Sequence, residues 1–294
     1  MTLRTKFVTI GLVLLVLTVC ANFAISKQDV NADTTYNVYL PLTMNNYVAP
    51  VISQVKGIAM VQPQYDIDLT NSGSTWYYTW TPYPQVYIDP RHIPMSRCGL
   101  FDTSIFPTDY TGYVLIFNEP VNKEPNGCGI TPQLAAERYM TFMDTYPNVI
   151  PVVGNNGVNG APWNMDFIDA LKAADYPLPS VWGLHLYYES WYVTYFDFDH
   201  WVNNFVVLDS FITQSLGFQP EYWITEFAMA TGDPIIFEQM LDYIGTQDSI
   251  THVAPFTNRA MYNEPWWPSG WVVELYNDNG TLTPMGQVYK EWYP

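Results

Sequence analysis

The chain has 294 residues, enough for one large domain or two small ones. Its 11 lysines and arginines stand against 28 aspartates and glutamates, and the resulting net charge of −17 repels polyanions, which excludes nucleic acid as a partner. Aromatic side chains make up 17% of the chain and charged ones only 13%. A surface of low charge that is rich in aromatic rings favours a neutral, polyhydroxylated partner.

The first 24 residues are typical of a signal peptide, because a basic start precedes an apolar segment and then small residues suited to cleavage. An uncleaved membrane anchor is the alternative, since residues 7–26 carry no charge and can just span a bilayer. Lipid attachment at Cys20 is disfavoured by the bulky Val19 before it. We expect a secreted protein, with a surface-anchored one as the alternative. Residues 25–50 are expected to form a linker or an appended strand.

Two cysteines, Cys98 and Cys128, remain once the signal is removed. In an exported protein an even pair favours a disulfide, and two free buried thiols are the alternative. The sequence has no Cys-x-x-Cys pair and no His-x-x-x-His spacing. Asp197 and Asp199, near His200, lack the rest of an oxygen-ligand loop, so that we interpret them as solvated acids. We therefore predict no metal and no cofactor.

Eight short apolar runs alternate with helical stretches from residue 51 onward. Several runs are continuously apolar, which is typical of parallel strands buried on both faces. The pattern predicts a single α/β catalytic domain over residues 51–294, an eight-stranded β/α (TIM) barrel, whose usual size is about 250 residues. A doubly wound sheet is the alternative, but no Gly-x-Gly-x-x-Gly or P-loop follows any strand. The runs are residues 57–61, 76–80, 92–95, 113–117, 149–153, 181–187, 222–225 and 252–256.

Two glutamates stand at the ends of predicted strands: Glu119 is the second residue after the fourth, and Glu226 is the first residue after the seventh. Catalytic residues of such barrels lie at the C-terminal ends of strands. A lone acid there is usually structural, but a pair is what glycosidic bond cleavage needs. One acid protonates the leaving oxygen, and the other attacks or stabilises the developing oxocarbenium ion. The first must hold its proton near neutral pH, which needs an apolar or like-charged setting.

Five further motifs occur in order between Trp76 and Tyr293. They are Trp76-Tyr-Tyr-Thr-Trp80, His92-Ile-Pro-Met95, Phe117-Asn-Glu-Pro120, His185-Leu-Tyr187 and Asn279-Gly-Thr-Leu-Thr-Pro-Met-Gly286. With them the chain resembles the Asl1-like glycosyl hydrolase catalytic-core family, close to glycoside hydrolase family 128, whose studied members cleave β-1,3-glucans. The resemblance implies a secreted, retaining glycoside hydrolase that uses two glutamates on a neutral β-glucan. We expect it to act within the glucan chain, like an endo-β-1,3-glucanase.

The resemblance also implies roles for single residues. It makes Glu119 the general acid/base and Glu226 the nucleophile. Asn118 would bind the sugar 2-hydroxyl, and Tyr187 would donate a hydrogen bond to Glu226. For His185, a site residue and a buried structural histidine are equally good interpretations.

The chain departs from the family at the end of the eighth predicted strand, which lacks a tryptophan that the family often has there. We expect Phe256 or a tryptophan of the following loop, Trp266 above all, to form that sugar-binding surface. Trp80 is another candidate for stacking on a sugar ring, with simple packing as the alternative.

A second Asn-Glu-Pro occurs at residues 263–265, and sequence context decides between the two copies. The pair Asn118-Glu119 directly follows five apolar residues, whereas Glu264 comes after a polar stretch and belongs to a loop. We therefore assign the acid/base role to Glu119.

A catalytically inactive glycan-binding barrel at the cell surface is the alternative function, which the missing tryptophan leaves open and the presence of both acids disfavours. The sequence does not settle the sugar, the linkage, or endo against exo action. We expect a polysaccharide or oligosaccharide as partner, a monomeric protein, and membrane contact only if the N-terminal segment stays uncleaved.

Overall fold

The structure is a computed structural model that describes residues 54–65, 67–81, 89–100, 109–123, 127–187, 197–229, 231–260 and 272–293. The predicted signal peptide, the predicted linker, Glu264 and Trp266 lie outside these residues. The described residues belong to one compact unit, Pro50–Pro294. No described helix has both the length and the apolar composition that a membrane span requires.

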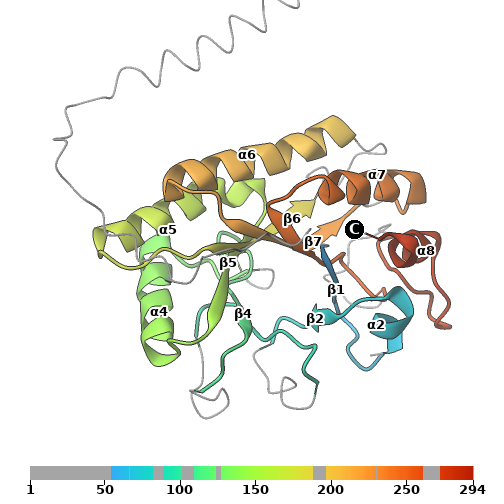
Figure 1. Cartoon of the computed structure of the whole chain (residues 1–294), viewed down its shortest axis with the longest axis horizontal. Helices are drawn as coiled ribbons and strands as arrows, with labels where there is room; N and C mark the ends of the chain where they lie inside the picture. Colours follow the sequence, from blue (N-terminus) through green and yellow to red (C-terminus); the bar gives the residue numbers. More distant parts are fainter. Residues whose placement is uncertain are drawn as a thin grey trace, which may run out of the picture. The chain divides into compact units, whose positions relative to one another are not determined.

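Eight parallel strands form one sheet, in the order β2-β1-β8-β7-β6-β5-β4-β3. Figure 1 shows the strands at the centre of the unit with the helices outside them. The strands are β1 (Val55–Ala59), β2 (Trp76–Tyr78), β3 (Met95–Ser96), β4 (Tyr113–Ile116), β5 (Ile150–Asn156), β6 (Val181–Tyr187), β7 (Glu221–Ala228) and β8 (Ile250–Val253).

The barrel closes between β2 and the segment just before β3. Tyr77 and His92 form a parallel bridge. The Tyr77 N–H donates to the Arg91 carbonyl over 3.0 Å, and the Ile93 N–H donates to the Tyr77 carbonyl over 2.8 Å. The predicted class, an α/β barrel of eight parallel strands, is confirmed.

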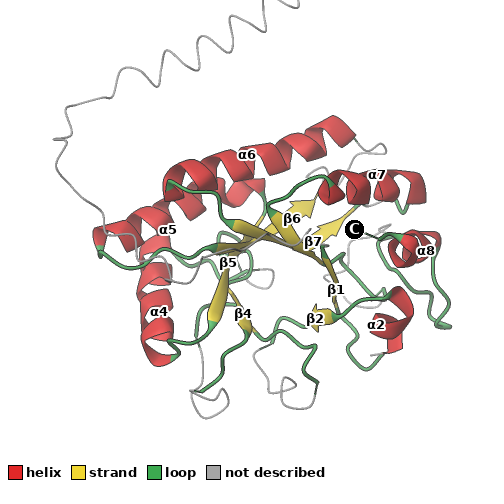
Figure 2. Cartoon of the chain, in the orientation of Figure 1, coloured by secondary structure: helices red, strands yellow, loops and turns green. Residues whose placement is uncertain are grey.

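Helices follow most strands and lie outside the barrel at the left, top and right of Figure 2, whereas loops lie beside β2 and β4 at the bottom. Side-chain caps begin several of them, as the sequence predicts at Thr131, whose hydroxyl accepts the Leu134 N–H before the proline that starts α4. Asp197, interpreted above only as a solvated acid, is the N-cap of α6 and accepts the His200 N–H over 3.1 Å. The helices are α2 (Ile67–Ser72), α4 (Pro132–Thr145), the short 3₁₀ helix η1 (Val158–Gly160), α5 (Ala161–Ala173), α6 (Phe198–Leu216), α7 (Pro234–Gly245) and α8 (Pro284–Glu291).

Aromatic rings fill the barrel near the N-terminal ends of its strands. Trp223 stacks on His252 with ring centroids 3.7 Å apart, and Tyr113 and Trp76 pack against Trp223 at 4.6 and 5.1 Å. Gly57 of β1 leaves room for this packing, because an added Cβ would lie 2.2 Å from the Trp76 ring. The N-terminal ends of the strands therefore enclose a packed core, and a catalytic site is expected at their C-terminal ends.

His92, which forms the bridge that closes the barrel, makes the stability of the fold depend on pH. Burial lowers the pKa of His92 to about 4, whereas an unfolded histidine titrates near 6.5. Between pH 6.5 and 4 the unfolded chain therefore binds a proton that the folded chain does not. As the pH is lowered through this range, the free energy of unfolding decreases by about 3 kcal/mol in total. Urea unfolding at several pH values should show this extra loss in the wild type and not in His92→Gln. An identical pH dependence in the two proteins would refute this role of His92.

Candidate active site

The structure brings the two predicted acids together at the C-terminal ends of the strands. Glu119 lies three residues beyond β4, and Glu226 lies within β7. One carboxylate oxygen of each, and one ring nitrogen of His185 from β6, all lie within 4.8 Å of one another. Residues from three strand ends thus converge on one point.

Three side chains donate hydrogen bonds to Glu226. The Tyr78 hydroxyl and the Trp80 indole N–H donate to Oε1 over 2.8 and 2.9 Å. The Tyr187 hydroxyl donates to Oε2 over 2.7 Å. Burial and the charge of Glu226 raise the pKa of both tyrosines well above the ordinary value, so that both keep their protons. Glu226, whose side chain is only 7% exposed, is thus fixed in place as an acceptor at both oxygens.

His185 lies between the two acids. Its Nδ1 is 3.3 Å from Oε1 of Glu119, its Nε2 is 3.5 Å from Oε1 of Glu226, and its side chain is fully buried. Burial by itself lowers the pKa of a histidine, but the charge of Glu226 and the hydrogen bond and charge of Glu119 outweigh it and raise the pKa. The ring therefore holds a proton more tightly than a free imidazole does.

Glu119 has a pKa opposite in direction to the one that the sequence analysis expected for a general acid. Burial raises the pKa, but the hydrogen bond and the charge of His185 lower it, with further lowering from Asn122 and Arg97, and the net effect is a decrease. The Asn122 amide donates to Oε2 over 2.9 Å. The opposite directions of the two pKa shifts favour a proton on His185 over one on Glu119.

The turn that carries Glu119 has an unusual backbone. Phe117 and Glu119 have φ values of +73° and +42°, in the left-handed region that residues other than glycine rarely adopt. Bonds from neighbouring strands hold this conformation: the Phe117 N–H donates to the Ser96 carbonyl over 2.9 Å, and the Glu119 N–H to the Asn155 carbonyl over 3.0 Å. Such strain persists only where the surroundings enforce it, which is common at functional sites.

The other predicted sugar-binding residues lie in different settings. Asn118 is buried beside Glu119, and its N–H donates to the Arg97 carbonyl over 2.9 Å. Trp80 is half-buried, and its ring packs against Phe256 with centroids 5.8 Å apart. Phe256, half-buried as well, also packs against the Tyr187 ring at 6.2 Å. Phe256 therefore borders two of the three donors of Glu226, Trp80 and Tyr187, where the sequence analysis expected a sugar-binding ring.

The structure joins Cys98 and Cys128 in a disulfide. This bond links the segment after β3 to the loop between β4 and α4. Gly129, next to Cys128, donates its N–H to the Asn122 carbonyl over 2.7 Å. The disulfide thus braces the loop that supplies the Asn122 amide to Glu119.

Sequence reasoning did not single out Tyr78, Asn122 or Asn155 as site residues. A signal existed for Tyr78, because alternate residues of a strand share a face and Trp76, Tyr78 and Trp80 alternate. Asn122 and Asn155 carry no such signal, since their contacts depend on turns and strand irregularities.

Glu119, His185 and Glu226 are by composition a possible set of metal ligands. Their hydrogen bonds argue for a different arrangement. The oxygens of Glu226 already accept hydrogen bonds from three O–H and N–H donors. Both ring nitrogens of His185 face carboxylates. The cluster is therefore explained as a proton-sharing group.

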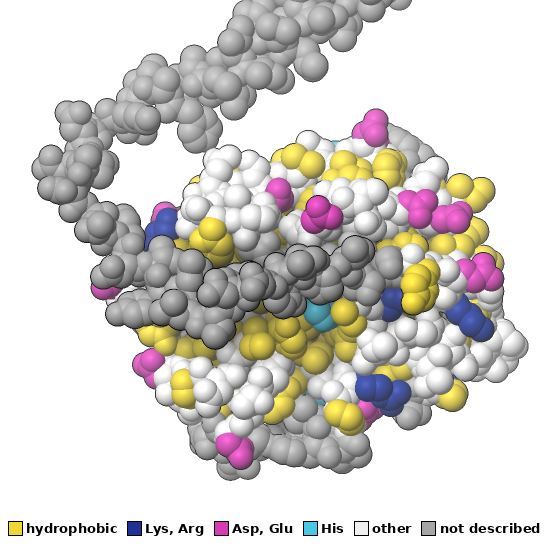
Figure 3. All heavy atoms as spheres, in the orientation of Figure 1, with side chains coloured by type: hydrophobic (Ala, Val, Ile, Leu, Met, Phe, Trp, Pro, Cys, Tyr) yellow, Lys and Arg dark blue, Asp and Glu magenta, His cyan; other side chains and the backbone are white. Residues whose placement is uncertain are grey.

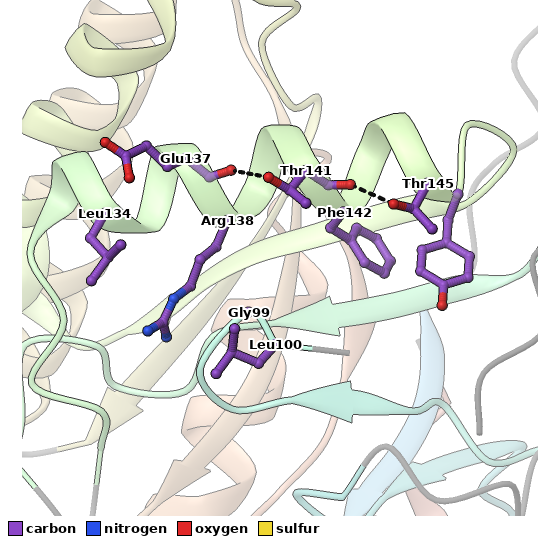
Figure 4. Close-up of a pocket in the computed structure, with 9 residues that line it drawn as sticks. Gly99, Leu100, Leu134, Glu137, Arg138, Thr141, Phe142 and Thr145 are labelled. Carbon is purple, nitrogen blue, oxygen red and sulfur yellow. Dashed lines mark hydrogen bonds between the residues drawn. The ribbon is translucent and has the colours of Figure 1, made fainter. Parts of the chain in front are cut away.

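A hollow lies outside the barrel, between α4 and residues 99–100 (Figure 4). Its polar groups are largely occupied: the Arg138 guanidinium donates to the Cys98 carbonyl over 2.7 Å, and the hydroxyls of Thr141 and Thr145 donate to carbonyls within α4. It contains no pair of facing carboxylates. Its lining residues are Gly99, Leu100, Leu134, Glu137, Arg138, Thr141, Phe142, Thr145 and Tyr146.

Comparison with known proteins identifies relatives of the chain. The family model described as "Glycosyl hydrolase catalytic core" matches residues 57–289. No curated protein sequence matches the chain significantly.

Several solved structures share the fold. A GH128 subgroup I endo-β-1,3-glucanase from Amycolatopsis mediterranei, in complex with laminaritriose, is 17% identical with a TM-score of 0.59, and the match covers 81% of this chain and 98% of that one. A subgroup II endo-β-1,3-glucanase from Sorangium cellulosum is 20% identical with a TM-score of 0.58 and the same coverage. A subgroup III curdlan-specific exo-β-1,3-glucanase from Blastomyces gilchristii, in complex with glucose, is 19% identical with a TM-score of 0.59, again with the same coverage.

Proposed function

Because the chain belongs to the glycosyl hydrolase catalytic core family and is a glycoside hydrolase, we propose that it cleaves β-1,3-glucan by double displacement. Glu119 is the general acid/base and Glu226 the nucleophile. The observation that carries the proposal is the close approach of two carboxylates at the open end of the barrel, with His185 between them.

The separation of the acids supports a retaining mechanism. Oxygens of the two carboxylates lie within 4.8 Å. Retaining glycosidases place their two carboxyl groups about 5–5.5 Å apart, whereas inverting ones place them about 6.5–9.5 Å apart to admit a water between them. This close approach is nearer to the arrangement of retaining enzymes and favours direct attack by Glu226.

The substrate class is supported by the structural neighbours and by the charge of the chain. The neighbours named above are β-1,3-glucanases of both endo and exo type. On the face in Figure 3, apolar side chains gather in the middle, and the lysine and arginine side chains among the described residues form no patch. A neutral glucan suits such a surface. The proposal includes two further points. The segment at residues 1–24 directs export of the protein, which suits a polysaccharide substrate, and cleavage takes place within the glucan chain.

In the first step, the proton of His185 passes through Glu119 to the glycosidic oxygen. The bond from that oxygen to C1 of the sugar breaks, and an oxygen of Glu226 forms a bond to C1. His185 is then neutral, Glu119 is a carboxylate and Glu226 is an ester. The hydrogen bonds from Tyr78, Trp80 and Tyr187 hold Glu226 in line for the attack.

In the second step, a water attacks C1 and gives its proton to Glu119, from which the proton returns to His185. The bond from C1 to Glu226 breaks, and Glu226 is a carboxylate again. Each group regains its starting state, so that the cycle balances without a metal or cofactor.

Replacing either acid is expected to lower turnover strongly while the fold is kept. Glu119→Gln removes the proton carrier and should lower kcat on laminarin by about 10²–10⁴-fold. Glu226→Gln removes the nucleophile and should cost at least as much. Release of reducing sugar measures both, and Glu137→Gln, which replaces an exposed glutamate of α4, is the matched control with wild-type activity expected.

Three outcomes separate the functional hypotheses. Equal activity in the wild type and both variants would contradict the assignment of the acids. Cleavage of another glycan but not of laminarin would contradict only the substrate. Glycan binding without turnover by the wild type would favour the inactive, glycan-binding alternative.

The pH profile tests the route of the proton. The required proton is present below the raised pKa of His185 and is lost above it, so that the alkaline limb of kcat/KM should have its midpoint above pH 6.5. In His185→Gln, Glu119 must hold the proton alone, and the alkaline limb should move to lower pH. An alkaline limb that stays in place in a folded His185→Gln protein would rule out this route.

A further inference from the structure

Two strand irregularities lie behind the catalytic acids. The pairing of β5 with β6 shifts its register at Asn155, and the pairing of β6 with β7 shifts at Thr225, the residue just before Glu226. Each shift leaves one residue without an opposite partner. Such bulges turn a side chain in a new direction and are common next to active sites.

The two irregular residues are bonded to each other. The Thr225 hydroxyl donates to Oδ1 of Asn155 over 2.9 Å. On its other side, Nδ2 of Asn155 donates to the carbonyls of Phe117 and Ile116 over 3.0 and 3.3 Å. The Asn155 carbonyl also accepts the N–H of Glu119 over 3.0 Å. Asn155 and Thr225 are fully buried, so that no solvent competes for these bonds.

We propose that Asn155 is the positioning residue of the catalytic pair and that, through Thr225, it fixes the separation of Glu119 and Glu226. This inference rests on the function proposed above. One side of Asn155 is bonded to the turn that carries Glu119, and the other to the residue before Glu226. A single side chain therefore sets both acids relative to each other.

The space around Asn155 is matched to this connection. Its side chain passes over β6 at Gly183, where an added Cβ would lie 2.0 Å from Oδ1 of Asn155. The backbone at Asn155 has φ of +49°, a left-handed conformation that asparagine adopts more readily than most residues. The bonds need one side chain with both a donor and an acceptor. Aspartate lacks the donor and leucine lacks both. Asparagine fits the space beside Gly183, tolerates the left-handed backbone and supplies both a donor and an acceptor.

The chemistry depends on this placement more than substrate binding does. A displacement of about 1 Å at the reacting groups can cost about 10²-fold in rate. Asn155 and Thr225 are fully buried and are not among the side chains expected to contact the sugar, so that KM should change little. Loss of the connection is therefore expected to lower kcat and leave KM in place.

The test compares Thr225→Val, which removes the hydroxyl while keeping the shape, with Thr225→Ser, which keeps the hydroxyl. Thr225→Val should lower kcat about 10–100-fold with KM within two-fold of wild type, and Thr225→Ser should restore most of kcat. Both are assayed on whichever glycan the wild type cleaves, after thermal unfolding has shown that they are folded.

A second readout needs no substrate. The His185 ring faces Glu119 beyond β4, Glu226 on β7 and the Tyr187 ring on its own strand, with the Tyr78 hydroxyl of β2 bonded to Glu226. NMR titration of His185 in the full chain therefore reports the distance of both carboxylates. If Thr225→Val lets one of them move away, the pKa of His185 should fall in that variant and not in Thr225→Ser.

A lower kcat together with a lower His185 pKa in Thr225→Val alone supports the inference. An unchanged His185 pKa, a kcat within three-fold of wild type, or an equal loss in Thr225→Ser overturns it. If Thr225→Val does not fold, Asn155→Asp, which loses the donor but keeps the size and the tolerance of the left-handed backbone, is judged by kcat and KM alone, because its added carboxylate itself affects the pKa of His185. A wild type that is inactive on β-1,3-glucan would contradict the proposed substrate and leave the titration as an independent test.

Discussion

The buried imidazole of His185 faces a carboxylate on each side, Glu119 at 3.3 Å and Glu226 at 3.5 Å. Two buried carboxylates this close repel each other, and burying an unpaired charge costs several kcal/mol. A protonated ring between them offsets both costs. The rest of the site keeps the three groups in register, with donors from β2 and β6 on Glu226 and the Asn122 amide on Glu119. The same ring explains why the pKa of Glu119 falls although the side chain is largely buried.

The barrel gives this group of charges a rigid frame. The half of the barrel at the N-terminal ends of the strands is filled by stacked rings around Trp223, so that the strands cannot shift without disturbing a packed core. At the C-terminal ends, the strands are irregular and are followed by turns with left-handed residues, which direct the acids to one point. The aromatic excess of the chain thus has two uses, since some rings pack the core and others, Tyr78, Trp80 and Tyr187, hold Glu226.

Much of the fold follows from local pattern. The apolar run at residues 181–187 is β6 in full, and the proline that starts α4 lies where the cap residue Thr131 predicts it. The run at 92–95 gave only the two-residue strand β3, Met95–Ser96, because Pro94 has no N–H to donate and the segment before it closes the barrel by the single Tyr77–His92 bridge. Glu226 was expected after its strand and lies within it, because β7 continues to Ala228.

The sequence predicts some of the site residues but not the contacts that link them. Glu119 and Glu226 are marked by their places after apolar runs, and the resemblance pointed to Tyr187. The direction of the Glu119 pKa was predicted wrongly, because it depends on a histidine 66 residues away in the chain. Asn155 was missed for a similar reason: its bond to Thr225 spans 70 residues and arises from two register shifts that no residue pattern announces.

The most direct test of the account is the stereochemistry of hydrolysis, followed by proton NMR of the products before they mutarotate. Double displacement through Glu226 predicts that the β-anomer of the new reducing end appears first and the α-anomer only later. If the α-anomer appears first, the two acids act by single displacement with a water between them, and the central claim is contradicted.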